Sequence, residues 1–214
     1  MLAVAAGLTL AAAATAADVT DPKVKLTKAD QAHATASVLV GSALGAAWSG
    51  SLEKPVAIKI PICPAYTPNN SDLTITGHAE GLSTLANEGL QIDTDVEIFK
   101  TTGQVDTLFK RMLQPKLATC LKYDLLKSVG RNGVIIGKVT LLTVPKAGTH
   151  AALFRVSLSV KNGSKAVGVD SDFLYVSQQR TVFFVNIVLP ESLESQLTPF
   201  EQKLAPTLAK RARV

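Results

Sequence analysis

The pattern of hydrophobic and polar residues changes its period several times along the chain. Residues 27–40 are rich in alanine, and Thr27 with Asp30 three positions later has the spacing of a capping box, which predicts a helix. Residues 49–72 hold several prolines and asparagines, so we expect a loop that encloses one short strand over 56–60.

A period of two follows this loop. Residues 73–80 and 92–98 each alternate apolar and polar side chains, which predicts two half-buried strands that form a long hairpin. Gly81 indicates a bulge at the end of the first strand. Between residues 104 and 129 the apolar positions return at intervals of three or four, which predicts two successive helices, the second with Pro115 in its first turn.

The last part of the chain predicts four further strands and a final helix. Short turn segments such as Asn162-Gly163 separate the strands, so we expect an antiparallel meander. The strands are expected over 134–144, 150–160, 165–177 and 180–189. Thr198 and Pro199 are typical of an N-cap and a first helical position, which predicts a helix that ends near Ala209.

This order of elements predicts an α+β fold. We expect an antiparallel, meander-type sheet packed by an N-terminal helix, a central helix pair and a C-terminal helix. Residues 27–214 are expected to form a single domain, as the length of 214 residues allows. Trp48, the only tryptophan, is expected in the core, with a place in a cleft wall as the alternative.

The N-terminal stretch differs from the rest of the chain. Residues 1–17 contain no charged side chain and end in small residues, which is typical of a secretory signal peptide with cleavage near Ala16 and Ala17. Residues 18–26 are then expected to form a polar linker. An ordinary N-terminal helix is the alternative, because no basic residue precedes the apolar run. The run is short and lacks flanking anchors, so no transmembrane segment is expected in the mature chain, which we place outside the cytoplasm, secreted or in the cell envelope.

Composition limits the classes of partner. The net charge of +5 favours a solvated basic surface with no partner, and an anionic envelope polymer or a lipid head group is the alternative. Aromatic residues make up 5% of the chain, which argues against base stacking, so we expect no nucleic acid as a partner. We expect a monomer.

Cys63 and Cys120 are the only two cysteines. In an oxidising compartment they are expected to form a disulfide, and two buried free thiols are the alternative. A catalytic thiol is not expected, because no histidine lies near Cys120 in the sequence and no C-x-x-C motif is present.

Motifs for common enzyme chemistries are absent or incomplete. Ser51 and Lys54 have the S-x-x-K spacing of serine β-lactamases, but the two companion motifs of that family are not present. The sequence has no G-x-S-x-G motif, no P-loop and no dinucleotide-binding glycine motif, so no cofactor is expected.

One polar strand face carries residue types that ligate divalent cations. His78 and Glu80 alternate with apolar residues on the first strand of the hairpin, and Asp93, Asp95 and Glu97 do so on the second. The pattern favours a solvated face with ordinary surface charges, so no metal is assigned. An extracytoplasmic hydrolase or metal-dependent enzyme that uses His78 with these carboxylates is the alternative.

A series of short segments covers most of residues 27–213 in a characteristic order. They are a helix that ends in LGAAWSG (44–50), the proline-flanked Cys63, SDLTITGHAEG (71–81), the strand at 96–99, the helix with Cys120 and Leu121, a hairpin from Pro145 to Gly148, and a strand that begins at Arg180. This order resembles a group of exported actinobacterial proteins of largely unknown function, whose relatives include the extracellular sensor domains of PknH-like receptor kinases. The resemblance implies an α+β fold with a curved antiparallel sheet and a concave face that holds a ligand.

The resemblance has limits. The kinase sensor domains have two disulfides, whereas this chain has cysteines for one, and it has no kinase region. Signal relay is therefore not implied, and no functional residue is carried over. The sequence favours a secreted, non-catalytic binding or sensor-like module with a cleft for a small molecule, a lipid or a cell-envelope component. A structural or protein-interaction domain is a further alternative.

Overall fold

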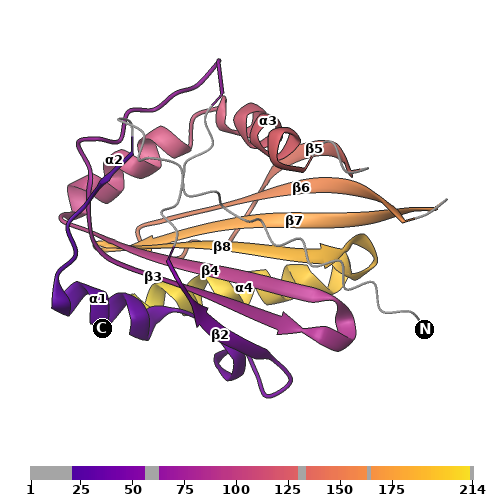
Figure 1. The fold of residues 1–214 in the computed structure, drawn as a ribbon, viewed down its shortest axis with the longest axis horizontal. Helices are drawn as coiled ribbons and strands as arrows, with labels where there is room; N and C mark the ends of the chain where they lie inside the picture. The colour runs from indigo at the N-terminus through magenta and orange to yellow at the C-terminus, as the bar shows by residue number, and fades with distance from the viewer. Residues whose placement is uncertain (1–20, 56–62, 130–133, 163–164, 213–214) are drawn as a thin grey trace.

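The protein is described by a computed structural model that covers residues 21–55, 63–129, 134–162 and 165–212 (Figure 1). The helices are α1 (Lys28–Ser37), α2 (Thr102–Met112), α3 (Leu117–Val129) and α4 (Glu194–Arg211). The strands are β1 (Lys23–Val24), β2 (Ser49–Glu53), β3 (Thr74–Leu85), β4 (Leu90–Phe99), β5 (Val134–Leu142), β6 (His150–Asn162), β7 (Lys165–Gln178) and β8 (Thr181–Pro190). Short 3-10 helices are η1 (Gly41–Ala43), η2 (Ala86–Glu88) and η3 (Glu191–Leu193).

The described strands form one curved, unclosed sheet of eight strands. Its order is β1-β3-β4-β8-β7-β6-β5, and β2 also pairs with β3. The β3–β4 hairpin and the β5–β8 meander are both present, and they join through antiparallel pairing of β4 with β8. The predicted α+β fold is therefore confirmed, with helices in the N-terminal, central and C-terminal parts of the chain.

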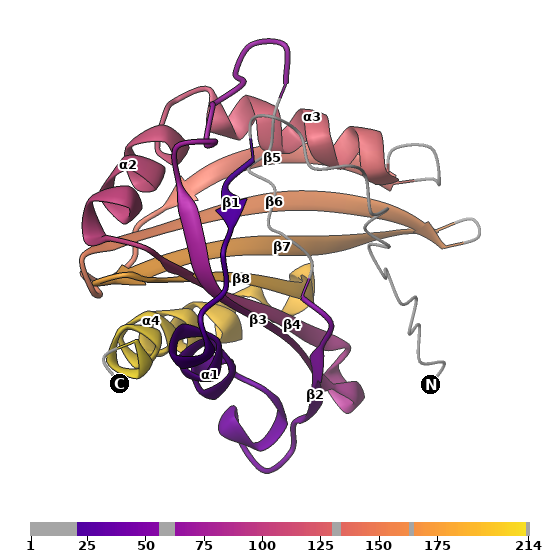
Figure 2. The same cartoon turned by 60° about the vertical axis from the view of Figure 1, so that its left-hand side comes forward.

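Helices pack on both faces of the sheet (Figure 2). On one face, α1 and α4 share a buried apolar cluster with the sheet, in which Val96 of β4 and Leu208 of α4 lie. On the opposite face, α2 and α3 share a second cluster, in which Phe99 of β4 and Phe109 of α2 lie. The central strands therefore have little contact with bulk water on either side.

Both ends of α1 are capped by side chains. The Asp30 backbone N–H donates to Thr27 Oγ1 at 3.1 Å, which confirms Thr27 as the N-cap. At the other end, the Arg211 guanidinium of α4 donates to the carbonyl oxygens of Ser37 and Val38 at 3.0 and 3.3 Å. A cation at a helix C-terminus is favourable, so Arg211 ties the last helix to the first.

Two glycines of β3 let the α1 segment approach the sheet closely. A Cβ atom at Gly77 would lie 2.3 Å from the Asp30 carbonyl oxygen, and one at Gly81 would lie 2.2 Å from Val40 Cγ1. The sheet register breaks between Ile75 and Gly77, so the bulge predicted at Gly81 is wrong. Gly81 pairs regularly, and its lack of a side chain makes room for Val40.

The last helix begins earlier than predicted. It starts at Glu194 rather than near Thr198, so Pro199 lies inside the helix. Leu197, in the added first turn, is buried in the core under α4. This burial and the ion pair of Glu194 with Arg155 stabilise a turn that the local sequence does not predict.

Two short strands lie where the sequence predicts a linker and a loop. β1 lies within residues 18–26 and pairs in parallel with β3, and β2 lies at the start of the segment 49–72 and pairs with β3 in antiparallel fashion. The strand expected over 56–60, and the signal peptide with its cleavage region at Ala16 and Ala17, lie outside the described residues.

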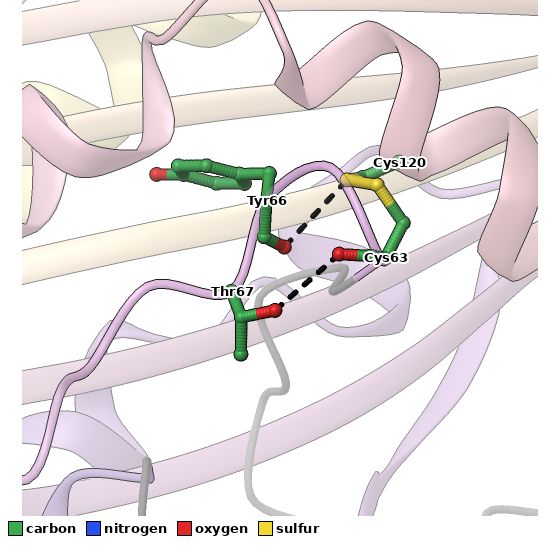
Figure 3. The surroundings of a disulfide bond; sticks show 4 residues. All are labelled: Cys63, Tyr66, Thr67 and Cys120. Carbon is green, nitrogen blue, oxygen red and sulfur yellow. Dashed lines mark hydrogen bonds between the residues drawn. A yellow bond between two sulfur atoms is a disulfide. The ribbon is translucent and has the colours of Figure 1, made fainter.

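Cys63 and Cys120 lie at disulfide-bonding distance, with their sulfur atoms 2.07 Å and their Cα atoms 5.2 Å apart (Figure 3). Cys63 and Tyr66 exchange two backbone hydrogen bonds, and the Tyr66 carbonyl oxygen lies 3.8 Å from Cys120 Sγ. The predicted disulfide therefore holds the turn at 63–66 against α3.

Replacing both cysteines (Cys63→Ser with Cys120→Ser) is expected to lower the free energy of unfolding by about 2–4 kcal/mol, because the bond closes a long loop of the unfolded chain. Urea unfolding of the double variant and the wild-type protein measures the difference. A double variant as stable as the wild type contradicts this role of the disulfide.

Gly77→Ala is expected to lower the free energy of unfolding by about 1–3 kcal/mol, because the added methyl group would overlap the Asp30 carbonyl. Gly103→Ala is the matched control, since a Cβ atom there would meet only Thr101 Oγ1, at 4.0 Å. Urea unfolding of the control should show no loss of stability, and an equal loss in both variants argues against the close approach as the cause.

Candidate functional site

Three side chains of ligating type meet on the face of the sheet that carries Phe99. His78 of β3 is directly opposite Glu97 of β4, and Asp95 lies two residues before Glu97, on the same face. His78 Nε2 lies 3.2 Å from Asp95 Oδ2. One ligating atom from each of the three residues lies within 4.8 Å of the other two. We call these three residues the His–Asp–Glu cluster.

The structure places the cluster in the interior of the protein. The exposed fractions of His78, Asp95 and Glu97 are 7%, 9% and 2%. Glu80 and Asp93, the other residues of the predicted polar face, are half-buried. The solvated face that the sequence favours is therefore wrong for the cluster, because β3 and β4 belong to a sheet that is covered on both sides.

Burial also controls the charge of this region. Removal from water raises the pKa of the Asp95 carboxyl well above its usual range, and the charge of Glu80 raises it further. The pKa of Asp93 is also raised, first by burial and then by Glu80 and Glu53, against the lowering effect of the Gln91 amide. Proximity of like charges adds to the cost of desolvation in both cases.

Gln31 of α1 holds the backbone of His78. Its side-chain amide donates to the His78 carbonyl oxygen at 2.6 Å, and its Oε1 accepts from the His78 N–H at 3.2 Å. β1 pairs with β3 only at Thr74 and Ile75, and β2 pairs with β3 from Glu80 onward. In the stretch between them, the Thr76 carbonyl oxygen accepts from the Thr27 N–H, and Gln31 pairs with His78. The position of His78 relative to β4 is thereby fixed by α1 as well as by the sheet.

Acidic residues form a row across three strands next to the cluster. Glu53 of β2 is opposite Glu80 of β3, which is opposite Asp95 of β4. Like charges in directly opposite positions destabilise a sheet. The sequence alone did not place Glu53 in this row, because the segment 49–53 has no strong period of two and predicts a loop.

A cavity of about 660 Å³ opens where the α2–α3 connection meets the segment after Cys63, and we call it the basic cavity. It is lined by Tyr66, Pro68, Thr107, Lys110, Arg111, Gln114, Pro115 and Lys116. Three of these residues are cationic, and none of the described lining residues is acidic. Arg111 also donates two hydrogen bonds to the Asp72 carboxylate, at 2.8 and 2.9 Å, and these bonds raise the pKa of Arg111. The sequence alone did not indicate this cavity, because its lining combines α2 and the α2–α3 connection with the distant segment after Cys63.

A second cavity, of about 230 Å³, has mostly apolar residues in its lining, with Glu88 as the exception. It is lined by Leu44, Trp48, Leu85, Glu88, Leu90, Leu189, Leu193, Leu197 and Phe200. The Trp48 ring stacks on Phe200 with the ring centroids 6.3 Å apart. Trp48 is half-buried: it packs against the edge of the core cluster and also lines this cavity, so the cleft-wall alternative describes its position better than a fully buried core position. The volume is below the usual range for small-ligand sites.

A buried charged network lies between β6, β7 and α4. Arg155 donates to its cross-strand partner Asp172 at 2.6–3.1 Å and pairs with Glu194. Glu201 Oε2 lies 3.7 Å from Arg155. Burial is the largest cause that raises the pKa of Glu201, to about 9, and the Asp172 carboxylate adds to it. Arg155 therefore pairs with both Asp172 and Glu194, while Glu201 stays protonated at neutral pH. The pairing of Arg155 with Glu194 attaches α4 to the sheet.

Glu201→Gln is expected to reduce the dependence of the unfolding free energy on pH. Because the folded-state pKa of Glu201 is raised, its contribution to stability is complete below its usual value of 4.5 and is lost as the pH rises toward about 9. Between about pH 5 and about pH 9, the free energy of unfolding of the wild-type protein should fall by at least about 1.4 kcal/mol more than that of the variant. This energy corresponds to a pKa shift of one unit. Urea unfolding at the two pH values measures this, and the exposed Glu191→Gln is the control. Equal slopes in the wild type and Glu201→Gln contradict the assignment.

Comparison with known proteins places the chain in no family: no protein-family model matches it, and no curated protein matches it. Within the described part of the chain, no helix is long and apolar enough to cross a membrane. What the protein can bind is therefore indicated by the chemistry of the sites themselves. The His–Asp–Glu cluster offers one nitrogen and carboxylate oxygens to a cation, and the basic cavity offers positive charge to an anion.

Proposed function

We propose that the protein is an exported, non-catalytic binding module, similar in role to a sensor domain, that holds a phosphate-bearing small molecule or envelope component in the basic cavity. The observation that carries the proposal is a cavity of about 660 Å³ with three cationic residues in its lining. Sites for small ligands commonly have volumes of about 300–1,000 Å³.

The charges around the basic cavity favour an anion. Lys110 and Lys116 are exposed at the cavity, and Arg111, whose guanidinium group is paired with Asp72, is the third cationic residue of the lining. α3 begins at Leu117, directly after Lys116, so the positive end of its helix dipole is adjacent to the same cavity. Ammonium groups, a guanidinium group and a helix N-terminus are the groups by which proteins bind phosphate.

The wall of the basic cavity is held in place without a ligand. The disulfide attaches the turn at 63–66 to α3, and the Tyr66 hydroxyl donates to the Arg111 carbonyl oxygen of α2. The two hydrogen bonds from Arg111 to Asp72 connect α2 to the segment that leads into β3. A wall that is already ordered loses less conformational entropy when a ligand binds.

The proposed location outside the cytoplasm has separate support. Residues 1–17 have the composition of a secretory leader, and the Cys63–Cys120 disulfide is typical of an oxidising compartment. The resemblance to exported sensor domains agrees with this location and with a binding role.

Reversal of charge at the cavity (Lys110→Glu with Lys116→Glu) is expected to weaken the binding of inorganic pyrophosphate at least about tenfold, equal to about 1.4 kcal/mol, as measured by isothermal titration calorimetry. Lys138→Glu with Lys203→Glu is the matched control, because it changes the net charge equally at exposed positions outside the cavity lining. The control should change the affinity by less than about twofold at moderate ionic strength, where distant surface charges are screened.

Vesicles distinguish the two sources of phosphate. Co-sedimentation with phosphatidylglycerol vesicles and not with phosphatidylcholine vesicles assigns a lipid head group, whereas pyrophosphate binding alone assigns a soluble ligand. Binding to neither probe, or an equal loss in the cavity variant and its control, contradicts the proposed function.

A further inference from the structure

We propose that His78, Asp95 and Glu97 bind a first-row divalent cation, Zn²⁺ or Mn²⁺, between β3 and β4. The proposal uses none of the residues that line the basic cavity, so it does not depend on the proposed function.

The cluster has nearly the spacing of a coordination sphere. One donor atom from each residue lies within 4.8 Å of the others, and His78 Nε2 and Asp95 Oδ2 are 3.2 Å apart. Donor atoms about 2.1 Å from a cation lie about 3.0–3.4 Å from their neighbours in octahedral or tetrahedral coordination. The His78–Asp95 pair therefore already has the required spacing, and the remaining separations exceed it by no more than about 1.8 Å.

Asp95 supplies the observation that points to a bound cation. The residue is 9% exposed, and its Oδ1 atom is buried with no hydrogen-bond partner among the residues that the structure describes. A buried carboxylate oxygen without a partner is costly, and native proteins rarely retain one without a reason. A cation coordinated by this carboxylate replaces the water that the group has lost.

The neighbouring acidic row increases the attraction for a cation. Glu80 is directly opposite Asp95, and Glu53 is directly opposite Glu80. Such like-charged neighbours repel each other. A divalent cation bound beside them changes the net electrostatic interaction from repulsive to attractive. The row is notable because the chain as a whole carries a net charge of +5.

The backbone at His78 is held in place by both α1 and the sheet. Gln31 holds the backbone of His78 through two hydrogen bonds, and the β3–β4 register fixes His78 opposite Glu97. A ligand whose backbone is already fixed loses less conformational entropy when a cation binds.

The donor set indicates the class of cation. Imidazole nitrogen suits first-row transition metals and zinc, whereas Ca²⁺ and Mg²⁺ prefer sets made entirely of oxygen. Three protein ligands leave at least one coordination position for water or an exogenous ligand.

The test is a titration of the full chain, freed of metal with EDTA, with ZnCl₂ and separately with MnCl₂ by isothermal titration calorimetry. We expect the wild-type protein to bind one equivalent of at least one cation with micromolar or tighter affinity. Asp95→Asn and His78→Gln should each weaken binding at least about tenfold. Asp93→Asn removes a half-buried carboxyl from the same face of β4 outside the cluster, and it should change the affinity by less than about twofold.

A measurement on the wild-type protein makes the test independent of the folding of the variants. Mn²⁺ broadens the NMR signals of nearby nuclei, and the chain has three histidines. A small amount of Mn²⁺ should broaden the imidazole signals of His78 before those of His33 and His150. The proposal is overturned if neither cation binds the wild type, if Asp95→Asn binds as tightly as the wild type, if Asp93→Asn loses as much affinity, or if His33 or His150 broadens first.

Discussion

Helices on both faces of the sheet impose the constraint on which the other features of this protein depend. A charged side chain on a central strand must find a partner inside the protein or become neutral, because water is excluded from both faces. The network around Arg155 meets this requirement with a cross-strand ion pair to Asp172 and a protonated Glu201. The His78–Asp95 pair meets it only in part, since Asp95 Oδ1 has no hydrogen-bond partner among the described residues.

The position of α1 also affects the geometry of the His–Asp–Glu cluster. Asp30 of α1 accepts two hydrogen bonds from Arg180 at 2.8 and 3.1 Å, and these bonds are the main reason that its pKa is lowered to about 2. Gly77 lets α1 approach β3 closely enough for Gln31 to hold the His78 backbone. The packing of α1 therefore helps the β3–β4 register to set where the imidazole lies relative to the carboxylates of β4.

Local signals predicted most of the elements and part of the site. The period of two over 73–80 and 92–98 predicted the β3–β4 hairpin, and Thr27 is the N-cap of α1 as its spacing indicated. Local signals were wrong where packing competes with them: α4 extends before Pro199 because Leu197 is buried there, and Gly81 makes room for α1's following segment rather than forming a bulge.

The sequence by itself determined the fold class, the hairpin, the meander and the cysteine pair, because these depend on periodicity, turn residues and cysteine count within the chain. Only the tertiary structure decided that β4 joins β8, and that both faces of the resulting sheet are covered. Alternation shows which residues share a face of a strand, but not whether water or a helix lies against that face. For that reason the sequence predicts an ordinary surface at His78, Asp95 and Glu97, whereas in the folded protein these residues form a buried cluster.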